Sequence, residues 1–365
     1  MASILGAMLR LLAASSLVVV ACGNRAAPRV EPTPADNVDA GDRVTLVGGT
    51  VVGSGPMDVV IEGKLIASGA ARGETIDVSG KYLVPAFIDS HVHLTYHRVG
   101  TELAQSGVAA AVDMAAPLSS FGEATEPLVL LRAGPMITAL GGYPTRSWGY
   151  GGYGLEIAAA ADARQAVDDL ERAGAGLIKI PLTAAPSMDL ETATAVVQRA
   201  HELGLKVAAH ALEEANAAMA ASAGVDVLAH TPTEALSAAT VEAFGGRALV
   251  STLAAFGGSE TAVDNLRRLR DEEVTVLYGT DLGNTRLPGI QPDEIALLAS
   301  AGLSPQEIID AGTRSPAGYW GFADLGAIAA GKRASFLVLP SDPLLDPAVL
   351  SAPEAVYLDG VRVGP

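Results

Sequence analysis

Short alternations of apolar and polar residues occur near both ends of the chain. Between positions 43 and 80 they are broken by Gly and predict antiparallel strands at 44–47, 51–52, 59–61, 65–67 and 76–78. The pattern returns at 335–339, 355–358 and 361–363, where Asp359 and Gly360 predict a hairpin turn. We therefore expect a small β-sandwich domain in which residues 43–80 form the first part and residues 331–365 the second.

The pattern between these ends is different. Residues 81–330 alternate apolar runs with helical stretches rich in Ala, Leu and Glu, which is typical of a parallel sheet with crossover helices. Eight strand segments are predicted, at 83–88, 109–113, 136–139, 177–180, 206–209, 225–229, 247–250 and 275–278. Because eight parallel strands close a barrel, the predicted fold class is α/β, a (β/α)8 TIM barrel. A doubly wound open sheet is the alternative, but no Gly-x-Gly-x-x-Gly sequence opens a helix here.

The first part of the chain carries an export pattern. Arg10 precedes the apolar run 11–21, which is too short to span a bilayer and predicts a signal peptide over residues 1–22, with Met1 or Met8 as the start. Val19-Val20-Ala21-Cys22 resembles a bacterial lipobox, so we expect lipidation at Cys22; a plain signal peptide with an incidental cysteine is the alternative. Residues 23–42 contain prolines without any periodicity and predict a flexible tether. The mature protein is thus expected to be extracytoplasmic and bound to a bacterial cell membrane through a lipid anchor only.

Composition narrows the function. With 365 residues, of which 49% are hydrophobic and 18% charged, the chain is long and apolar enough to be globular. A formal net charge of -17 argues against duplex DNA and anionic lipid as electrostatic partners, so we expect no nucleic-acid binding. Cys22 is the sole cysteine, which excludes a disulfide within the chain.

Candidate metal ligands follow the predicted barrel strands. In a TIM barrel the active site lies at the carboxyl ends of the strands. Residues of metal-binding or unusual chemistry at these ends are His91, His93, His210, His230 and Asp281, together with Lys179 inside an apolar strand. The i, i+2 spacing of His91 and His93 points both imidazoles to one side of an extended segment. A single histidine at a strand end is more often structural, but this coincidence predicts one common site.

The motifs around these residues resemble those of the metal-dependent amidohydrolase superfamily, in particular its imidazolonepropionase-like and Xaa-Pro dipeptidase-like branch. The resemblance covers residues 43–365, and its motifs are 80–93, 207–210, 224–230, 278–281, 311–317 and 325–332. Ala86 stands where the family usually has Gly after Pro85, and Arg333-Ala-Ser-Phe replaces its usual Ala-Asp pair. Neither departure affects a candidate ligand.

The resemblance implies a metal site and a mechanism. His91, His93 and Asp281 match the ligands of a first ion, His210 and His230 those of a second, and Lys179 matches the lysine that bridges both ions when carboxylated. These ligand types suit Zn²⁺, with other divalent metals and a single ion as alternatives. A metal-bridging hydroxide would attack the substrate, and Asp281 would shuttle the proton to the leaving amine.

Substrate contacts are expected from loops. The Gly-rich segment 141–154 concentrates aromatic residues and predicts a substrate loop, with a plain surface loop as the alternative. The candidate contacts are Tyr96, His97, Tyr143, Arg146 and Arg286, of which the two arginines are candidate carboxylate receptors.

These observations predict an enzyme that hydrolyses a carbon–nitrogen bond in a small amide, cyclic amide or dipeptide-like substrate. An esterase, lactonase or organophosphate hydrolase at the same site is one alternative. A catalytically retired binding lipoprotein is another, although no candidate ligand is missing. A homo-oligomer is possible in each case.

Overall fold

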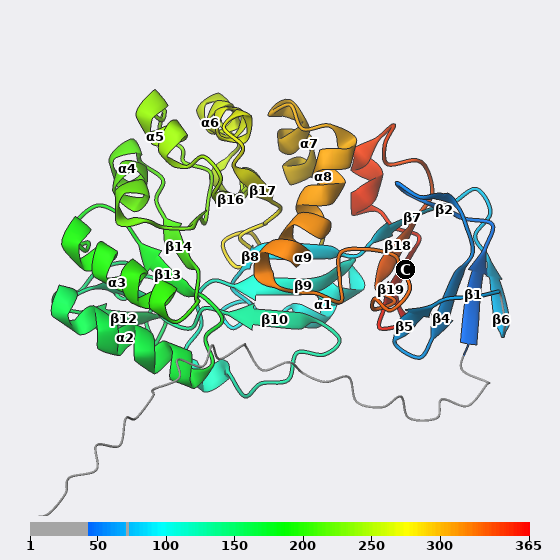
Figure 1. Cartoon of the computed structure of the whole chain (residues 1–365), viewed down its shortest axis with the longest axis horizontal. Helices are drawn as coiled ribbons and strands as arrows, with labels where there is room; N and C mark the ends of the chain where they lie inside the picture. The colour runs from blue at the N-terminus through cyan, green and yellow to red at the C-terminus, as the bar shows by residue number, and fades with distance from the viewer. Residues whose placement is uncertain (1–42, 71–72) are drawn as a thin grey trace, which may run out of the picture. The chain divides into compact units, whose positions relative to one another are not determined.

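The computed structural model describes residues 43–70 and 73–365 (Figure 1). The predicted signal peptide, the lipidation site Cys22 and the tether lie outside the described residues and stay predictions. Within the described part, no helix is both long and apolar enough to cross a membrane.

Strands from both ends of the described chain form small sheets together. One sheet has the order β5-β4-β1-β6, from β1 (Arg43–Val47), β4 (Val59–Glu62), β5 (Leu65–Ala67) and β6 (Glu74–Asp77). Another has the order β20-β19-β18-β7-β2-β3, from β2 (Thr50–Val51), β3 (Gly55–Pro56), β7 (Tyr82–Pro85), β18 (Phe336–Leu339), β19 (Ala355–Leu358) and β20 (Val361–Gly364). Their shared apolar core includes Leu46, Leu83 and Phe336, each fully buried. The predicted hairpin is confirmed, because β19 and β20 pair antiparallel around Asp359 and Gly360, whose φ angles are 51° and 78°.

Parallel strands make up the barrel. The strands are β8 (Phe87–Val92), β9 (Val108–Asp113), β10 (Val129–Arg132), β13 (Ile178–Pro181), β14 (Val207–His210), β15 (Val227–Leu228), β16 (Ala248–Val250) and β17 (Thr275–Leu277). Strands β11 (Met136–Ala139) and β12 (Gly154–Ile157) pair with each other in a separate two-stranded parallel sheet. Parallel ladders join β8 to β9 and β10, and β13 in order to β17. The amide of Gly176, just before β13, donates to Arg132 O at the end of β10 (2.9 Å). The ring closes where Ser90 N donates to Tyr278 O (2.9 Å) and His93 N to Leu282 O (2.7 Å).

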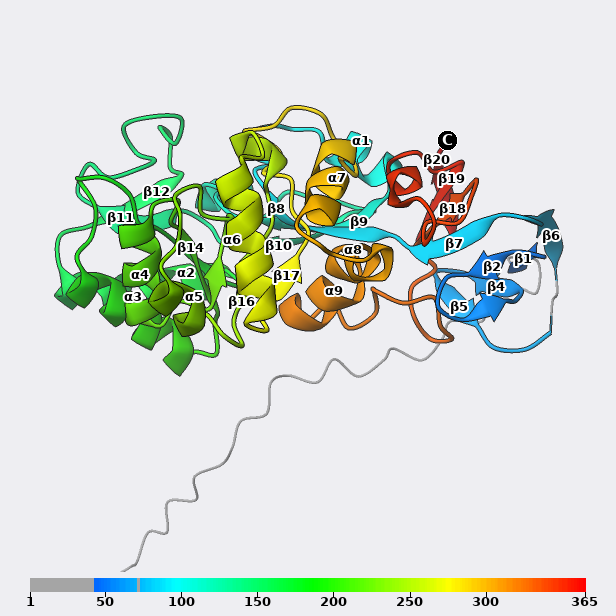
Figure 2. The ribbon, with the colours of Figure 1, turned by 90° about the horizontal axis from the view of Figure 1, so that it is seen from above.

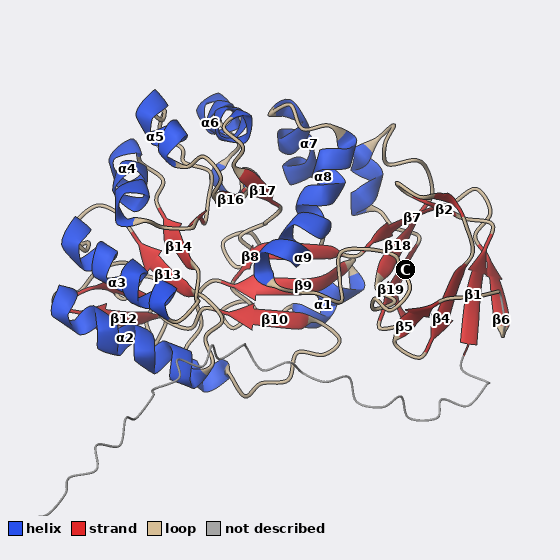
Figure 3. Ribbon diagram, in the orientation of Figure 1, coloured by secondary structure: helices blue, strands red, loops and turns tan. Residues whose placement is uncertain are grey.

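Helices lie outside the strands (Figures 2 and 3). They are α1 (Gly100–Gln105), α2 (Ala160–Ala173), α3 (Leu190–Glu202), α4 (Glu214–Ala223), α5 (Ala238–Ala243), α6 (Glu260–Asp271), α7 (Pro292–Ser300), α8 (Pro305–Gly312) and α9 (Arg314–Trp320). Short 3₁₀ turns are η1 (Leu118–Ser120), η2 (Ala254–Phe256) and η3 (Pro347–Ser351). Local sequence explains where several helices begin, since the side chains of Asp189, Ser259 and Ser304 accept hydrogen bonds from first-turn amides. The predicted TIM barrel is confirmed.

The strand predicted at 83–88 is wrong in its extent. The chain forms β7 up to Pro85, paired with β18 in the small sheet, and β8 from Phe87 in the barrel. Strands β10 and β12 were not predicted. The domain boundaries at 80/81 and 330/331 stay predictions.

Candidate metal centre and substrate pocket

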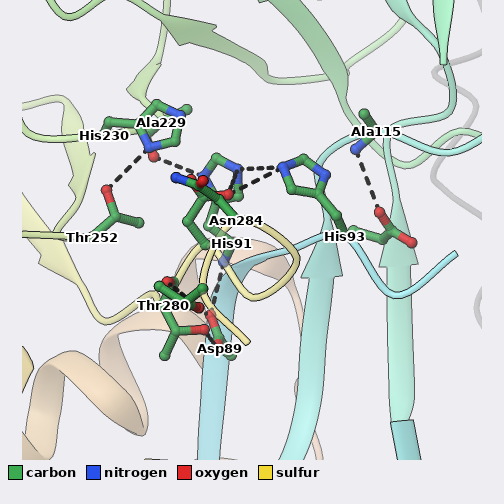
Figure 4. A network of polar contacts seen from close by, with 12 residues as sticks. Asp89, His91, His93, Ala115, Ala229, His230, Thr252, Thr280 and Asn284 are labelled. Atoms are coloured by element: carbon green, nitrogen blue, oxygen red, sulfur yellow. Dashed lines mark hydrogen bonds and ion pairs between the residues drawn. The ribbon is translucent and has the colours of Figure 1, made fainter. Parts of the chain in front are cut away.

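His91, His93 and Asp281 form a compact buried cluster at the junction of β8 with the segment after β17. The Nε2 atoms of His91 and His93 are 3.2 Å apart (Figure 4). They lie 3.4 and 3.2 Å from Asp281 Oδ1. Asp281 has a φ of 51°, a left-handed conformation that is strained for a residue other than Gly and is typical of functional sites. Two imidazole nitrogens and a carboxylate oxygen this close together can hold a metal ion.

A second layer of hydrogen bonds orients His91. Its Nδ1 lies 2.8 Å from the carbonyl oxygen of Ala229, so Nδ1 carries the proton and donates it there, and Nε2 keeps a free electron pair toward the cluster. Asp89 accepts from the amide of His91 (3.0 Å) and from the amide and hydroxyl of Thr280 (3.1 and 2.5 Å). These hydrogen bonds join β8 to the segment that carries Asp281. Burial raises the pKa of Asp89 to about 7.

His230 and His210 extend the cluster across the barrel end. The His230 ring lies 4.4 Å from the His91 ring and 4.7 Å from the His210 ring, between centroids. His230 Nδ1 lies 3.1 Å from the hydroxyl oxygen of Thr252, the second residue after β16. Burial lowers the pKa of His91 and of His230 well below the ordinary value, and that of His210 to about 3. These three imidazoles are thus neutral at physiological pH, as metal ligation requires.

Lys179 lies on β13 and is fully buried. Its Nζ has no hydrogen-bond partner among the described residues. Asp281 Oδ1 likewise has none, and it lies 3.4 and 3.2 Å from the Nε2 atoms of His91 and His93. Burial lowers the pKa of Lys179 to about 7, because an ammonium in an apolar interior is costly. Unpartnered donor atoms at the core of the cluster fit a bound metal.

A cavity of about 190 Å³ opens on this cluster. Its lining consists of His91, His93, His210, His230 and Asp281, with Tyr96, Met136, Tyr143, Trp148, Phe256, Gly283, Asn284 and Arg286. Tyr143 and Trp148 come from the Gly-rich segment, and Trp148 Nε1 donates to the Tyr143 hydroxyl at 2.6 Å. The Trp148 ring lies 5.0 Å from the His93 ring, so an aromatic wall borders the candidate metal ligands.

The predicted substrate contacts separate into distinct groups. Tyr96, Tyr143 and Arg286 line the cavity. His97 does not; its ring nitrogen Nε2 hydrogen-bonds the carbonyl oxygen of Arg286 at 3.0 Å. Arg146 lines a different hollow, beside Gly141, Thr183 and Pro186.

Several lining residues were missed by the sequence analysis. Trp148 belongs to the Gly-rich, aromatic-rich segment 141–154, so the sequence pattern that predicted a substrate loop could have identified it. Phe256 and Asn284 gave none, because each follows a strand in a turn of unremarkable composition.

The comparisons with known proteins agree with this geometry. The Amidohydrolase family model matches residues 82–363. An uncharacterized protein of Mycobacterium tuberculosis is 25% identical over 350 residues, which cover 84% of this chain and 91% of that protein. The structure of a Xaa-Pro dipeptidase with bound methionine in the active site is 20% identical, with a TM-score of 0.74 and coverage of 88% of this chain and 99% of that chain. A prolidase complexed with N-methylphosphonate-L-proline is 21% identical, with a TM-score of 0.71 and coverage of 88% and 99%.

At these identities the solved structures show a common fold and no more. The family match is stronger evidence, because it spans the whole barrel and the strands after it, including every candidate ligand. The chain belongs to the amidohydrolase family and is a hydrolase that acts on carbon–nitrogen bonds.

Proposed function

We propose that this enzyme is a metal-dependent hydrolase of amide, cyclic amide or dipeptide-like bonds, with Zn²⁺ as its metal. The observation that carries the proposal is the buried cluster of His91, His93 and Asp281 facing the unpartnered amine of Lys179. His91, His93 and Asp281 would hold one ion, and His210 and His230 a second. When bound, zinc would supply Lewis-acid polarisation of the substrate carbonyl and a hydroxide nucleophile at neutral pH.

Lys179 supports the bridged form of this site. Reaction of its unprotonated amine with CO₂ forms a nitrogen–carbon bond, releases one proton and leaves a carbamate. This change removes a buried amine that has no hydrogen-bond partner and supplies oxygen atoms of the kind that divalent metals prefer. The lysine's place in the apolar strand β13 then has a chemical reason.

Asp281 is the residue that we propose for proton transfer. Its Oδ1 faces the imidazoles, its Oδ2 accepts from Asn284 Nδ2 at 3.3 Å, and the residue lines the cavity. A carboxylate held in this way takes a proton from the attacking water and delivers it to the leaving amine. Tyr143, Trp148 and Phe256 give the same space an aromatic lining.

Metal content tests the proposal. We would measure zinc by plasma mass spectrometry in the full chain, after reconstitution with zinc and bicarbonate, alongside hydrolysis of a panel of N-acyl amino acids, Xaa-Pro dipeptides and cyclic amides. Wild type should hold about two zinc ions per chain, and Lys179→Ala should lose metal and activity together. His201→Ala is the matched control, since His201 is an exposed histidine of α3 that pairs with Asp226. Wild-type protein that holds no metal after reconstitution would reject the proposed metal centre.

A further inference from the structure

We infer that Arg286 is the carboxylate receptor of the cavity, so that the substrate is an amide that also carries a free carboxylate. This inference deepens the proposed function, on which its reference to an amide rests. The recognition of the carboxylate itself does not require turnover and can be tested separately.

Charge is the first argument. Among the described residues that line the cavity, Arg286 is the one arginine or lysine. It forms no ion pair with a described carboxylate, whereas Arg98, on the neighbouring turn, pairs with Glu123 at 3.1 Å. A guanidinium presents paired N–H donors that match a carboxylate in bidentate fashion. Arg286 therefore has this capacity available at the cavity.

Two contacts orient Arg286, which is otherwise exposed. Its guanidinium carbon lies 5.6 Å from the centroid of the Tyr96 ring, a cation–π arrangement. Its carbonyl oxygen accepts from His97 at 3.0 Å, and the turn that leads to it is closed by the amides of Asn284 and Thr285, which both donate to Asp281 O at 3.0 Å. The backbone of Arg286 is thus held at a set place relative to Asp281, while its exposed guanidinium lies against the Tyr96 ring.

A row of aromatic rings runs from Arg286 to the candidate metal ligands. Tyr96 lies 5.3 Å from Trp148, and Trp148 lies 5.0 Å from His93, between ring centroids. A substrate whose carboxylate contacts Arg286 and whose scissile carbonyl lies near His93 would extend along these rings. An apolar or aromatic group between the two would pack against Tyr96 and Trp148.

Binding of a matched pair of probes tests the inference. Calorimetry would compare 3-phenylpropionate with 3-phenylpropionamide, which share the phenyl group and differ in charge. The proteins are the full-length wild type, Arg286→Gln, Arg286→Lys and the control Arg98→Gln. Wild type should prefer the carboxylate, and Arg286→Gln should weaken carboxylate binding by about 10-fold to 100-fold with little change for the amide. Arg286→Lys should recover part of the loss, because it keeps the charge without the planar fork.

Other results would overturn the inference. Equal affinity of wild type for both probes, or no binding of either, would do so. An equal loss for both probes in Arg286→Gln would show a merely structural role, and a carboxylate-specific loss in Arg146→Gln would move the receptor to the other loop. Failure of the proposed hydrolysis would instead appear as absent metal or turnover, and it leaves this probe preference intact.

Discussion

At the scale of single residues, Glu294 is a buried carboxylate that supports the cavity from outside it. It lies on α7 and accepts from the amides of Leu253 (3.1 Å) and Ala254 (2.7 Å). These bonds hold the turn η2, which carries Phe256 to within 4.9 Å of the His230 ring. Burial raises the pKa of Glu294 to about 7.

This raised pKa predicts a pH dependence. Because the folded protein binds the Glu294 proton more tightly than the unfolded chain, the contribution of this group to stability is complete below about pH 4.3 and is lost as the pH rises through about 7. We expect Glu294→Gln to show a smaller fall in the free energy of unfolding between about pH 5 and pH 8 than wild type, as measured by urea denaturation.

The variant should still retain some slope, since burial also raises the pKa of Asp89 and of Asp113. Glu272→Gln, at the exposed C-terminal cap of α6, should follow wild type. Parallel pH profiles for wild type and Glu294→Gln would contradict the assignment.

The sequence predicted the candidate ligands better than their supports. His91, His210, His230 and Asp281 come at the ends of apolar runs. The carboxyl ends of all strands in a TIM barrel lie on the same face, so these residues are expected to meet there. Glu294 acts on a turn 41 residues away in sequence, and Asp89 acts on Thr280 across 191 residues. Such roles arise from the packing of distant segments, which no local pattern records.

At the scale of elements, α8 packs unusually closely on β8. Gly312 ends this helix, and a Cβ at its position would lie 2.3 Å from Phe87 Cε2. Phe87 cannot move aside easily, because it is fully buried and packs edge-on against Tyr278 at 5.3 Å. The absence of a side chain at Gly312 thus lets the helix approach the strand that leads to His91.

Substituting this glycine should be costly. Gly312→Ala should lower the free energy of unfolding by about 1–3 kcal/mol through overpacking. Gly318→Ala, in α9, should be neutral or stabilising by up to about 1 kcal/mol, because its Cβ would meet no atom within 4 Å and Ala favours the helix. Urea denaturation of both variants measures the contrast, and similar losses in the two would show that helix propensity rather than contact with Phe87 decides the effect.

Element boundaries show where the pattern was insufficient. The run Leu83–Ile88 reads as one strand because its apolar residues are continuous. The run is divided into two strands only by the strands with which it pairs, since Leu83 pairs with Val338 and Phe87 with Val108. Strand β12 was missed because it begins at Gly154, inside a segment whose glycines favour a loop.

At the scale of the whole described molecule, the small sheets and the barrel share a continuous strand path. β7 pairs with β18 and is followed directly by β8. Phe336 in β18 is fully buried and stacks on Tyr357 at 5.0 Å. A loss of packing around Phe336 should therefore also lower the stability of the barrel, because β7 connects the two.

Phe336→Ala tests this coupling. It should cost about 3–5 kcal/mol, the usual range for a buried aromatic. Trp148 and Trp320 both lie beside the barrel. The unfolding transition of the variant should therefore shift by the same amount whether it is followed by tryptophan fluorescence or by far-ultraviolet circular dichroism. Leu345→Ala, at a side chain that is largely exposed, should leave both transitions unchanged. A dichroism shift without a fluorescence shift would mean that the small sheets unfold independently.

The ring closure between β8 and the segment after β17 has a further consequence for how the enzyme acquires an ion. His91 and His93 come early in the chain and Asp281 late, and they meet only where His93 N bonds Leu282 O. A growing or truncated chain that lacks residue 281 offers a bare pair of imidazoles. An ion held by these three residues, as proposed, would therefore be captured only after the barrel is complete, and it would raise the stability of the folded protein with the logarithm of the free ion concentration.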